Sequence, residues 1–450
     1  MNFAAIAWKS IRQRGLSSSL TSLSVALGVM LMVTVLVIFG ILQNTFNQKS
    51  IDYDLIVGAS GDPLQLVLST VYHVSPPIEN LPYKYLETLK KDPRVTVAIP
   101  ITLGDRTQVG GFPIVGTVPE FFDHDYAPGR QFMVKAVRAF QHPFDAYIGA
   151  RVAQENGWDV GTKLKLVHSG GEEHVHDEEF EVVGILGATG TPHDKTVYIN
   201  VKGFYQISGH DKPMAEAIRA ERAFFNQPEL SKEELEQEVA RLEKIHGKHD
   251  HGAEGHDHAH HHAHDLPDFQ KEVTAILLEC RSPIAAQLLA GEIKKAKKSQ
   301  AVNPLQPMQT LMNDILGPVQ LLLLILTILI ILVSGIGIFV SIYNSMSARR
   351  KEIAILRALG AQRSKVLAIV MAESVILCLS GGLLGLLLGH GLVLASSKSV
   401  EIYTGLLVNP FYFSIYEIIL FPCLLLLGVL VGFLPGMTAY QTDVADALNS

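Results

Sequence analysis

The chain has 450 residues, of which 48% are hydrophobic and only 18% charged, below the roughly 25% of charged residues usual in soluble proteins. This composition indicates a membrane protein. The net charge of −7 argues against a nucleic-acid-binding protein, which needs a basic face. The three cysteines are too few and too scattered for a disulfide framework, and only Cys280 lies outside an apolar run.

Four apolar stretches are long enough, or nearly so, to cross a bilayer, which takes about 20 helical residues. They are Val25–Leu42, Val319–Ile342, Val366–Ala395 and Ile418–Leu434. The first exceeds the roughly 7–15 apolar residues of a secretory signal and lacks a cleavage site, so we expect an uncleaved anchor. With their flanks, we expect the membrane helices within residues 1–43, 315–343, 366–395 and 415–440.

Basic residues around these stretches predict the orientation of the chain, because Lys and Arg accumulate on the cytoplasmic side. Lys9, Arg12 and Arg14 precede the first stretch, and a second basic group fills the connection 344–365. The predicted loop 396–414 contains a single basic residue, Lys398. We therefore expect both termini, including the tail 441–450, and the 344–365 connection in the cytoplasm. Residues 44–314 and 396–414 are then periplasmic, in a bacterial inner membrane.

The segment 44–314 is too long for a loop and has the pattern of an α/β domain. Residues 163–167, 179–186, 196–201 and 272–282 have strand character. Residues 81–92, 231–247 and 283–298 have helical spacing, and Ser231 with Glu234 fits a capping box. The predicted fold is therefore an α-helical membrane protein with four transmembrane helices and a large α/β extracytoplasmic domain between helices 1 and 2. A polar insertion covers about 203–270.

The sequence contains no recognisable catalytic motif. It has no G-x-S-x-G, no H-E-x-x-H and no G-x-x-x-x-G-K-[ST] phosphate loop. We therefore expect a non-catalytic subunit, and any ATP must be bound by another chain.

Three glycines form a stripe of small residues in the third apolar stretch. Gly381, Gly385 and Gly389 recur every fourth residue, on one face of a helix. Such stripes allow close helix contact in lipid. A contact within the chain and a contact between subunits both fit the pattern.

The connection between the second and third stretches resembles the permeases of the MacB, FtsX and LolC/LolE superfamily. Residues 345–389 begin SMSARRKEIAILRALGAQ, which is similar to that family's coupling helix R-x-E-I-G-I-x-[KR]-A-L-G-A, with Ala354 in place of the commoner Gly. The resemblance implies that this segment docks on an ATPase. The residues it assigns to coupling are Arg349, Arg350, Lys351, Glu352, Ile353, Leu356, Arg357, Leu359 and Gly360.

The resemblance extends to both ends of the chain and to the predicted domain. Residues 7–29, 112–132 and 182–199 are similar to the corresponding parts of MacB-type proteins, including their periplasmic core domain, and 432–448 resembles the family's C-terminal motif, with Gly436 and Val444 departing from it. This implies the separate-subunit form of a permease. It would pair with a cytoplasmic ABC ATPase and a second permease copy, as a homodimer or heterodimer, and work by mechanotransmission.

A histidine-rich run lies within the polar insertion. Nine of the nineteen residues 246–264 are histidine: His246, His249, His251, His256, His258, His260, His261, His262 and His264. Alternating imidazoles in a flexible chain bind zinc or other first-row metals loosely rather than one metal selectively. We expect either a metal-responsive segment outside the membrane, open to a periplasmic metal-binding or substrate protein, or a low-complexity insert without a metal role.

A second histidine group lies in the predicted hairpin. His174 and His176 share one face if residues 172–179 are extended, and His168 lies across the hairpin. These residues fit either a more ordered metal site or a solvated hairpin tip.

These features predict the permease subunit of an ABC transporter, acting on a protein, lipoprotein, lipid or peptide outside the membrane, with a link to zinc homeostasis. Bare ions are disfavoured as substrates, because no Asp/Glu/His chain lies at mid-membrane. The alternative is an FtsX-like signalling subunit that activates a periplasmic enzyme.

Overall fold

The computed structural model describes residues 8–9, 11–13, 15–46, 52–168, 175–207, 212–246, 266–348, 355, 362–404 and 408–441. The chain divides into two compact units. One comprises Met1–Phe46 with Met312–Ser450, and the other comprises Asn47–Leu311.

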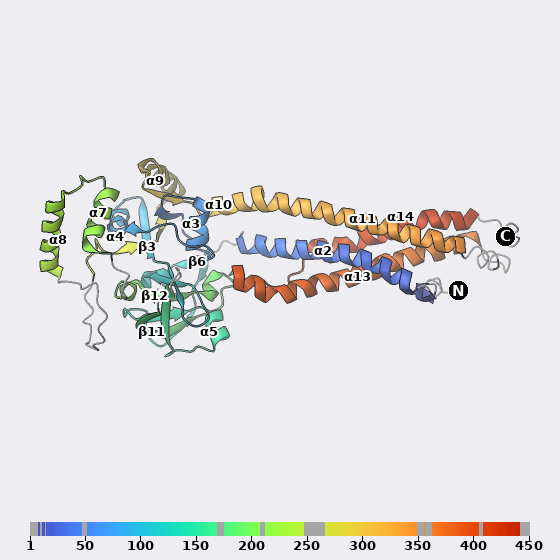
Figure 1. Cartoon of the computed structure of the whole chain (residues 1–450), viewed down its shortest axis with the longest axis horizontal. Helices are drawn as coiled ribbons and strands as arrows, with labels where there is room; N and C mark the ends of the chain where they lie inside the picture. Colours follow the sequence, from blue (N-terminus) through green and yellow to red (C-terminus); the bar gives the residue numbers. More distant parts are fainter. Residues whose placement is uncertain are drawn as a thin grey trace. The chain divides into compact units, whose positions relative to one another are not determined.

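The first unit is built from four long helices (Figure 1). They are α2 (Gly15–Phe46), α11 (Gly317–Ala348), α13 (Arg363–Thr404) and α14 (Ile415–Gln441). Their apolar segments are Gly15–Gln43, Leu305–Met346, Arg363–Val400 and Ile415–Thr438, each long and apolar enough to cross a membrane. The predicted set of four membrane helices with a large α/β domain between the first and second is confirmed.

Helix α13 lies in the middle of this unit, in extended contact with both α2 and α14, while α11 packs mainly on α2. The buried face of α2 carries Val25, Val29, Val33 and Val37, all fully buried. A valine at every fourth position forms a ridge that fits the groove of a neighbouring helix. The ridge therefore fixes which side of α2 faces its partners.

The second unit contains an antiparallel four-stranded sheet with the order β15-β1-β14-β3. Its strands are β1 (Leu55–Ala59), β3 (Val95–Ile101), β14 (Ala275–Cys280) and β15 (Ser299–Val302). Helices α3 (Pro63–Thr70), α4 (Tyr83–Lys90) and α9 (Pro283–Ala296) pack on these strands. The core between them contains Val57, Leu86, Ile276 and Leu289.

A mixed seven-stranded sheet has the order β4-β10-β11-β9-β12-β5, with β8 also paired to β11. Its strands are β4 (Asp105–Thr107), β5 (Ile114–Thr117), β8 (Val134–Ala136), β9 (Asp145–Ile148), β10 (Lys163–His168), β11 (Val175–Leu186) and β12 (Val197–Asn200). Its core includes Leu166, Phe180, Val182 and Ile199, with α5 (Ala150–Asn156) against one face.

Shorter elements connect these sheets. They are β2 (Leu81–Pro82), β6 (Asp125–Ala127), β7 (Arg130–Gln131), β13 (Glu272–Val273), α6 (Val201–Phe204), α7 (Met214–Phe224), α8 (Lys232–His246), α10 (Leu305–Thr310), the 3₁₀ turns η1 (Pro119–Asp123) and η2 (Pro192–Lys195), and the π-helical turn Leu311–Leu316.

Several local predictions are confirmed by these elements. The predicted strands correspond to β10, β11, β12 and β13–β14, and the predicted helices to α4, α8 and α9. The capping box that begins α8 is present: the backbone N–H of Ser231 donates to Glu234 Oε2 at 2.8 Å, and the N–H of Glu234 donates to Ser231 Oγ at 3.3 Å. The stretch predicted as a polar insertion thus contains two ordered helices, α7 and α8.

Candidate functional site

Most of the predicted coupling segment lies outside the described residues. The part that is not described includes all nine residues that the resemblance assigns to coupling: Arg349, Arg350, Lys351, Glu352, Ile353, Leu356, Arg357, Leu359 and Gly360. Ile355, which is described, has a helical backbone and a side chain that is 51% exposed. Along the chain, this segment joins α11 to α13.

The glycine stripe of α13 lies against α2 within the same chain. A Cβ at Gly381, Gly385 or Gly389 would come between 2.6 and 2.9 Å from the nearest atom of α2. On the other side, Gly428 and Gly432 of α14 lie against α13. Contacts this short need glycine, because any side chain would push the backbones apart. Both helix pairs are therefore tightly fitted.

Serine hydroxyls join the helices at several levels. Ser17 and Ser24 of α2 lie 2.9 and 2.8 Å from Ser341 and Ser334 of α11, measured between hydroxyl oxygens. Ser22 of α2 makes the corresponding contact with Ser380 of α13 at 3.2 Å. Interhelical hydrogen bonds of this kind contribute about 0.6 kcal/mol each in membrane proteins. They keep α2 in register with two neighbours.

A histidine–carboxylate pair joins α13 to α14. His390 Nε2 lies 3.0 Å from Glu417 Oε2, and His390 Nδ1 lies 3.1 Å from the Pro410 carbonyl oxygen. The other carboxylate oxygen, Glu417 Oε1, accepts the backbone N–H of Ser414 at 2.9 Å, in the manner of a capping box at the start of α14. Glu417 thus begins its own helix and binds the neighbouring one.

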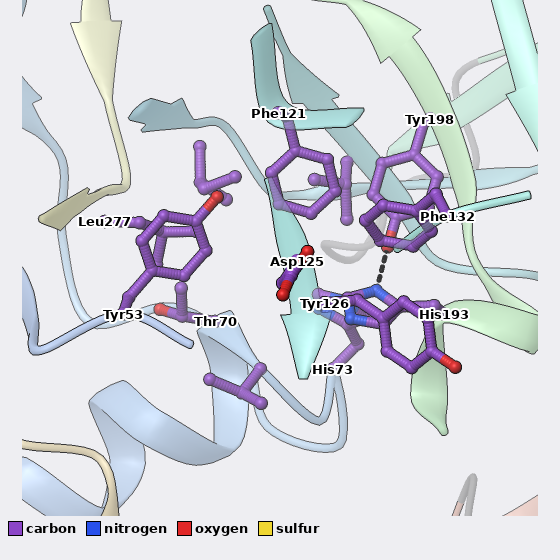
Figure 2. A pocket seen from close by; sticks show the side chains of 13 residues that line it. Tyr53, Thr70, His73, Phe121, Asp125, Tyr126, Phe132, His193, Tyr198 and Leu277 are labelled. Atoms are coloured by element: carbon purple, nitrogen blue, oxygen red, sulfur yellow. Dashed lines mark hydrogen bonds between the residues drawn. The ribbon is translucent and has the colours of Figure 1, made fainter. Parts of the chain in front are cut away.

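A small cavity of about 30 Å³ lies between the two large sheets of the α/β domain. Figure 2 shows the rings of Phe121, Phe132 and Tyr198 on one side and Tyr53 across from them. The buried hydroxyls of Tyr53 and Thr70 have no hydrogen-bond partner among the described residues. A space of this size has room for one water molecule but not for a transported substrate.

Two histidines beside this cavity are held in the neutral form. Burial lowers the pKa of His193 to about 3 and that of His73 to about 4. Figure 2 shows the hydrogen bond between His193 Nδ1 and the hydroxyl of Tyr198. Burial also raises the pKa of Tyr198 well above its ordinary value, so both partners are uncharged near neutral pH.

The predicted metal-binding residues fall into two groups. In the histidine-rich run, His249, His251, His256, His258, His260, His261, His262 and His264 lie outside the described residues, and His246 is the last residue of α8. His174 also lies outside them. His176 is buried on β11 beside His168, and Asp105 of β4 completes a group whose ligand atoms all lie within 4.8 Å of one another.

Cys280 is buried at the end of β14. Burial, followed by the nearby charge of Asp54, raises the pKa of its thiol to about 11. The thiol is therefore protonated near neutral pH, which is the unreactive form of a cysteine.

Comparison with known families matches both units. Residues 18–227 match the family described as MacB-like periplasmic core domain, and residues 324–443 match FtsX-like permease C-terminal. The first match extends through α7. The α/β domain and the helices that follow it therefore carry the two domains that define a class of membrane permease.

Curated relatives carry the name macrolide export ATP-binding/permease protein MacB. The protein from Shewanella sp. (strain W3-18-1) is 35% identical over 130 residues, and that from Agrobacterium fabrum 33% over 132 residues. Each alignment covers 28% of this chain and only 19% of the relative. The periplasmic region of MacB from Actinobacillus actinomycetemcomitans is 14% identical, with a TM-score of 0.32 over 61% of this chain and 98% of that one. The chain belongs to the MacB/FtsX family of permeases.

Sequence reasoning missed three members of these sites. Asp105 is 63 residues from His168, and only the pairing of β4 with β10 brings them together. Glu417 lies at the edge of an apolar stretch, where its pairing with His390 has no local signal. His193 follows Pro192 in a 3₁₀ turn, and a lone histidine of this kind does not indicate burial.

Proposed function

We propose that this chain is the transmembrane subunit of an ABC transporter and that a separate cytoplasmic ATPase subunit drives it. The observation that carries the proposal is the coupling motif, R-K-E-I-A-I-L-R-A-L-G-A at 350–361, placed between two helices of a MacB/FtsX-type permease. The sequence has no phosphate-loop motif of its own. We propose the orientation that the basic residues predict, with both termini and the coupling segment in the cytoplasm and the α/β domain in the periplasm.

The packing of the helices supports mechanical transmission. The coupling segment leads directly into α13, and α13 contacts α2 through glycines and α14 through a second pair of glycines. Close-packed helices move as rigid bodies, because interdigitated side chains resist sliding. A displacement of the coupling segment is thereby passed to α2, whose end leads into the α/β domain.

A co-purification assay tests the pairing with an ATPase. The tagged chain is extracted together with its cognate ATPase, and Leu356→Asp is compared with the wild type. We expect the charged substitution to abolish co-purification, because it places a carboxylate in an apolar contact. Lys398→Asp, near the far end of α13, is the control and should retain the ATPase. Equal recovery with Leu356→Asp would contradict the proposed contact.

The proposed substrate class is a protein, lipoprotein, lipid or peptide handled outside the membrane. Among the described parts of the membrane helices, the one His–carboxylate pair is His390 with Glu417, which joins α13 to the first turn of α14, and a single pair does not make a proton relay. The cavity of about 30 Å³ between the sheets is far too small for such a client, whereas a more open pocket of about 560 Å³ lies between α7 and α8.

We further propose that the histidine-rich run 246–264 makes the transporter responsive to zinc. Its nine histidines can bind several first-row metal ions with modest affinity. ATP hydrolysis by the reconstituted complex, measured against buffered zinc, tests this with a variant that carries serine at the nine positions. A zinc response confined to the intact chain is expected, and identical curves would exclude gating by the run.

A further inference from the structure

Three side chains from neighbouring strands converge at one edge of the seven-stranded sheet. Asp105 and His168 are directly paired across β4 and β10, and His168 Nδ1 lies 2.8 Å from Asp105 Oδ1. The imidazoles of His168 and His176 have ring centroids 4.6 Å apart, in an edge-to-face arrangement. Directly paired residues of antiparallel strands point to the same face, which explains the first contact.

An irregularity in β11 brings His176 to this group. The pairing of β10 with β11 shifts register between Lys165 and Val167, so that Lys165 pairs with Glu179 but Val167 with Val175. β11 therefore has two extra residues at this point. A bulge of this kind re-aims side chains out of strict alternation. His176 lies within it and is only 1% exposed.

The group has the composition and the spacing of a zinc site. Two histidines and one carboxylate, with a solvent molecule in the fourth position, are a standard ligand set for zinc. Ligand atoms around a tetrahedral zinc ion lie about 3.3 Å apart, given bonds of about 2.0–2.1 Å. In the structure the three ligand atoms lie within 4.8 Å of one another. Closing to zinc geometry therefore takes side-chain movements of about 1 Å.

The surroundings provide both shielding and access. Asp105 is 3% exposed, so its carboxylate is removed from water, whereas the side chain of His168 is 38% exposed. A metal ion can therefore reach the group past His168 and be held against two buried ligands. A bound ion would also offset the cost of burying a carboxylate at this depth.

We propose that Asp105, His168 and His176 bind a single zinc ion that links β4, β10 and β11. This site is distinct from the histidine-rich run and differs in kind, because its ligands lie on paired strands rather than in a low-complexity segment. It is a site for one ion at a fixed position. Its occupancy would hold the outer strands of the sheet together.

Metal binding by the full-length chain tests this site without any ATPase. The parent chain for this assay carries serine in place of the nine histidines of 246–264 and a purification tag without histidine, so that neither can bind zinc. It is reconstituted in lipid nanodiscs and stripped of metal. Zinc is titrated against a chromophoric chelator, and cobalt is titrated separately to record its visible absorption. The variants are Asp105→Asn and His168→Ala, with His142→Ala, at an exposed histidine of the same domain, as the matched control.

We expect the parent chain and His142→Ala to bind one zinc ion, with cobalt absorption typical of four ligands. A lost ligand should weaken binding by at least about 100-fold, since even an outer-shell partner of a ligand is worth 10–100-fold. Zinc binding that is absent from the parent chain, or unchanged in Asp105→Asn and His168→Ala, would overturn the site. That result would leave the ATPase pairing intact, because co-purification measures it independently.

Discussion

Gly385 of α13 lies directly against Val29 of α2: a Cβ at Gly385 would come 2.6 Å from the Cβ of Val29 and equally close to the Ala26 carbonyl oxygen. Two helices that approach this closely have no room for adjustment at that level. The contact is the tightest of the three glycine contacts between α13 and α2, and it places the two helices in one packing unit.

Gly385→Leu should destabilise the helical unit by about 1–3 kcal/mol, the usual cost of overpacking a close contact. Gly391→Ala is the matched control, because it lies on the same helix and a Cβ there meets no atom within 4 Å. Thermal melting of the detergent-solubilised chain measures both. Equal melting temperatures would show that α13 does not pack on α2 through this face.

The pair formed by His390 and Glu417 should be energetically coupled. Their nitrogen–oxygen distance is 3.0 Å, and the Glu417 side chain is only 5% exposed. Removing either partner leaves the other buried with fewer partners. A double-mutant cycle with His390→Ala and Glu417→Ala should give a coupling energy of about 0.5–3 kcal/mol. Strictly additive effects on unfolding would mean that the two side chains act independently.

The stability of the α/β domain should fall as the pH decreases below about 6.5. Because the folded-state pKa of His193 is about 3 and that of His73 about 4, the unfolded chain takes up protons first. Stability is thus fully present above the ordinary histidine pKa of 6.5 and is lost on acidification toward pH 4. Each histidine contributes up to about 2 kcal/mol of this loss between pH 7 and pH 5.

Urea unfolding in a Trp8→Phe background measures this pH dependence, since Trp158 is then the one tryptophan and packs against the core of the seven-stranded sheet. His193→Gln should reduce the difference in unfolding free energy between pH 7 and pH 5, whereas His142→Gln should leave it unchanged. If His193→Gln retains the full difference, His193 is not held neutral in the folded domain.

Asp194 stabilises the loop before β12. It is buried, and its carboxylate accepts the backbone N–H of Thr189 at 2.7 Å, the hydroxyl of Thr189 at 2.7 Å and the N–H of Gly190 at 2.8 Å. Asp194→Ala removes three hydrogen bonds to a charged acceptor in a partly buried loop and should cost about 1–3 kcal/mol. The same Trp158 assay measures the cost, with exposed Asp177→Ala as control. A loss no larger than that of the control would contradict this role.

The sequence predicts the elements of this fold better than their contacts. Runs of apolar residues and capping signals are local, so α8 with Ser231 and Glu234 follows from spacing alone. Asp105 could not be predicted as a partner of His168, because strand order is set by packing of the whole sheet. The bulge that turns His176 inward likewise depends on tertiary pairing.

The membrane helices illustrate the same division. The stripe of Gly381, Gly385 and Gly389 predicts a close helix contact but fits a partner in either the same chain or another subunit. The structure assigns this stripe to α2 of the same chain. Glu417 is read locally as the start of a helix, whereas its bond to His390 depends on how α13 and α14 are packed.

The most direct test of the proposed function is the rate of ATP hydrolysis by the cognate ATPase, measured alone, with this chain in nanodiscs, and with its Leu356→Asp variant. Coupling predicts that the intact chain changes the rate and that Leu356→Asp restores the value of the isolated ATPase. Identical rates in all three preparations would contradict a permease driven through the 349–361 segment.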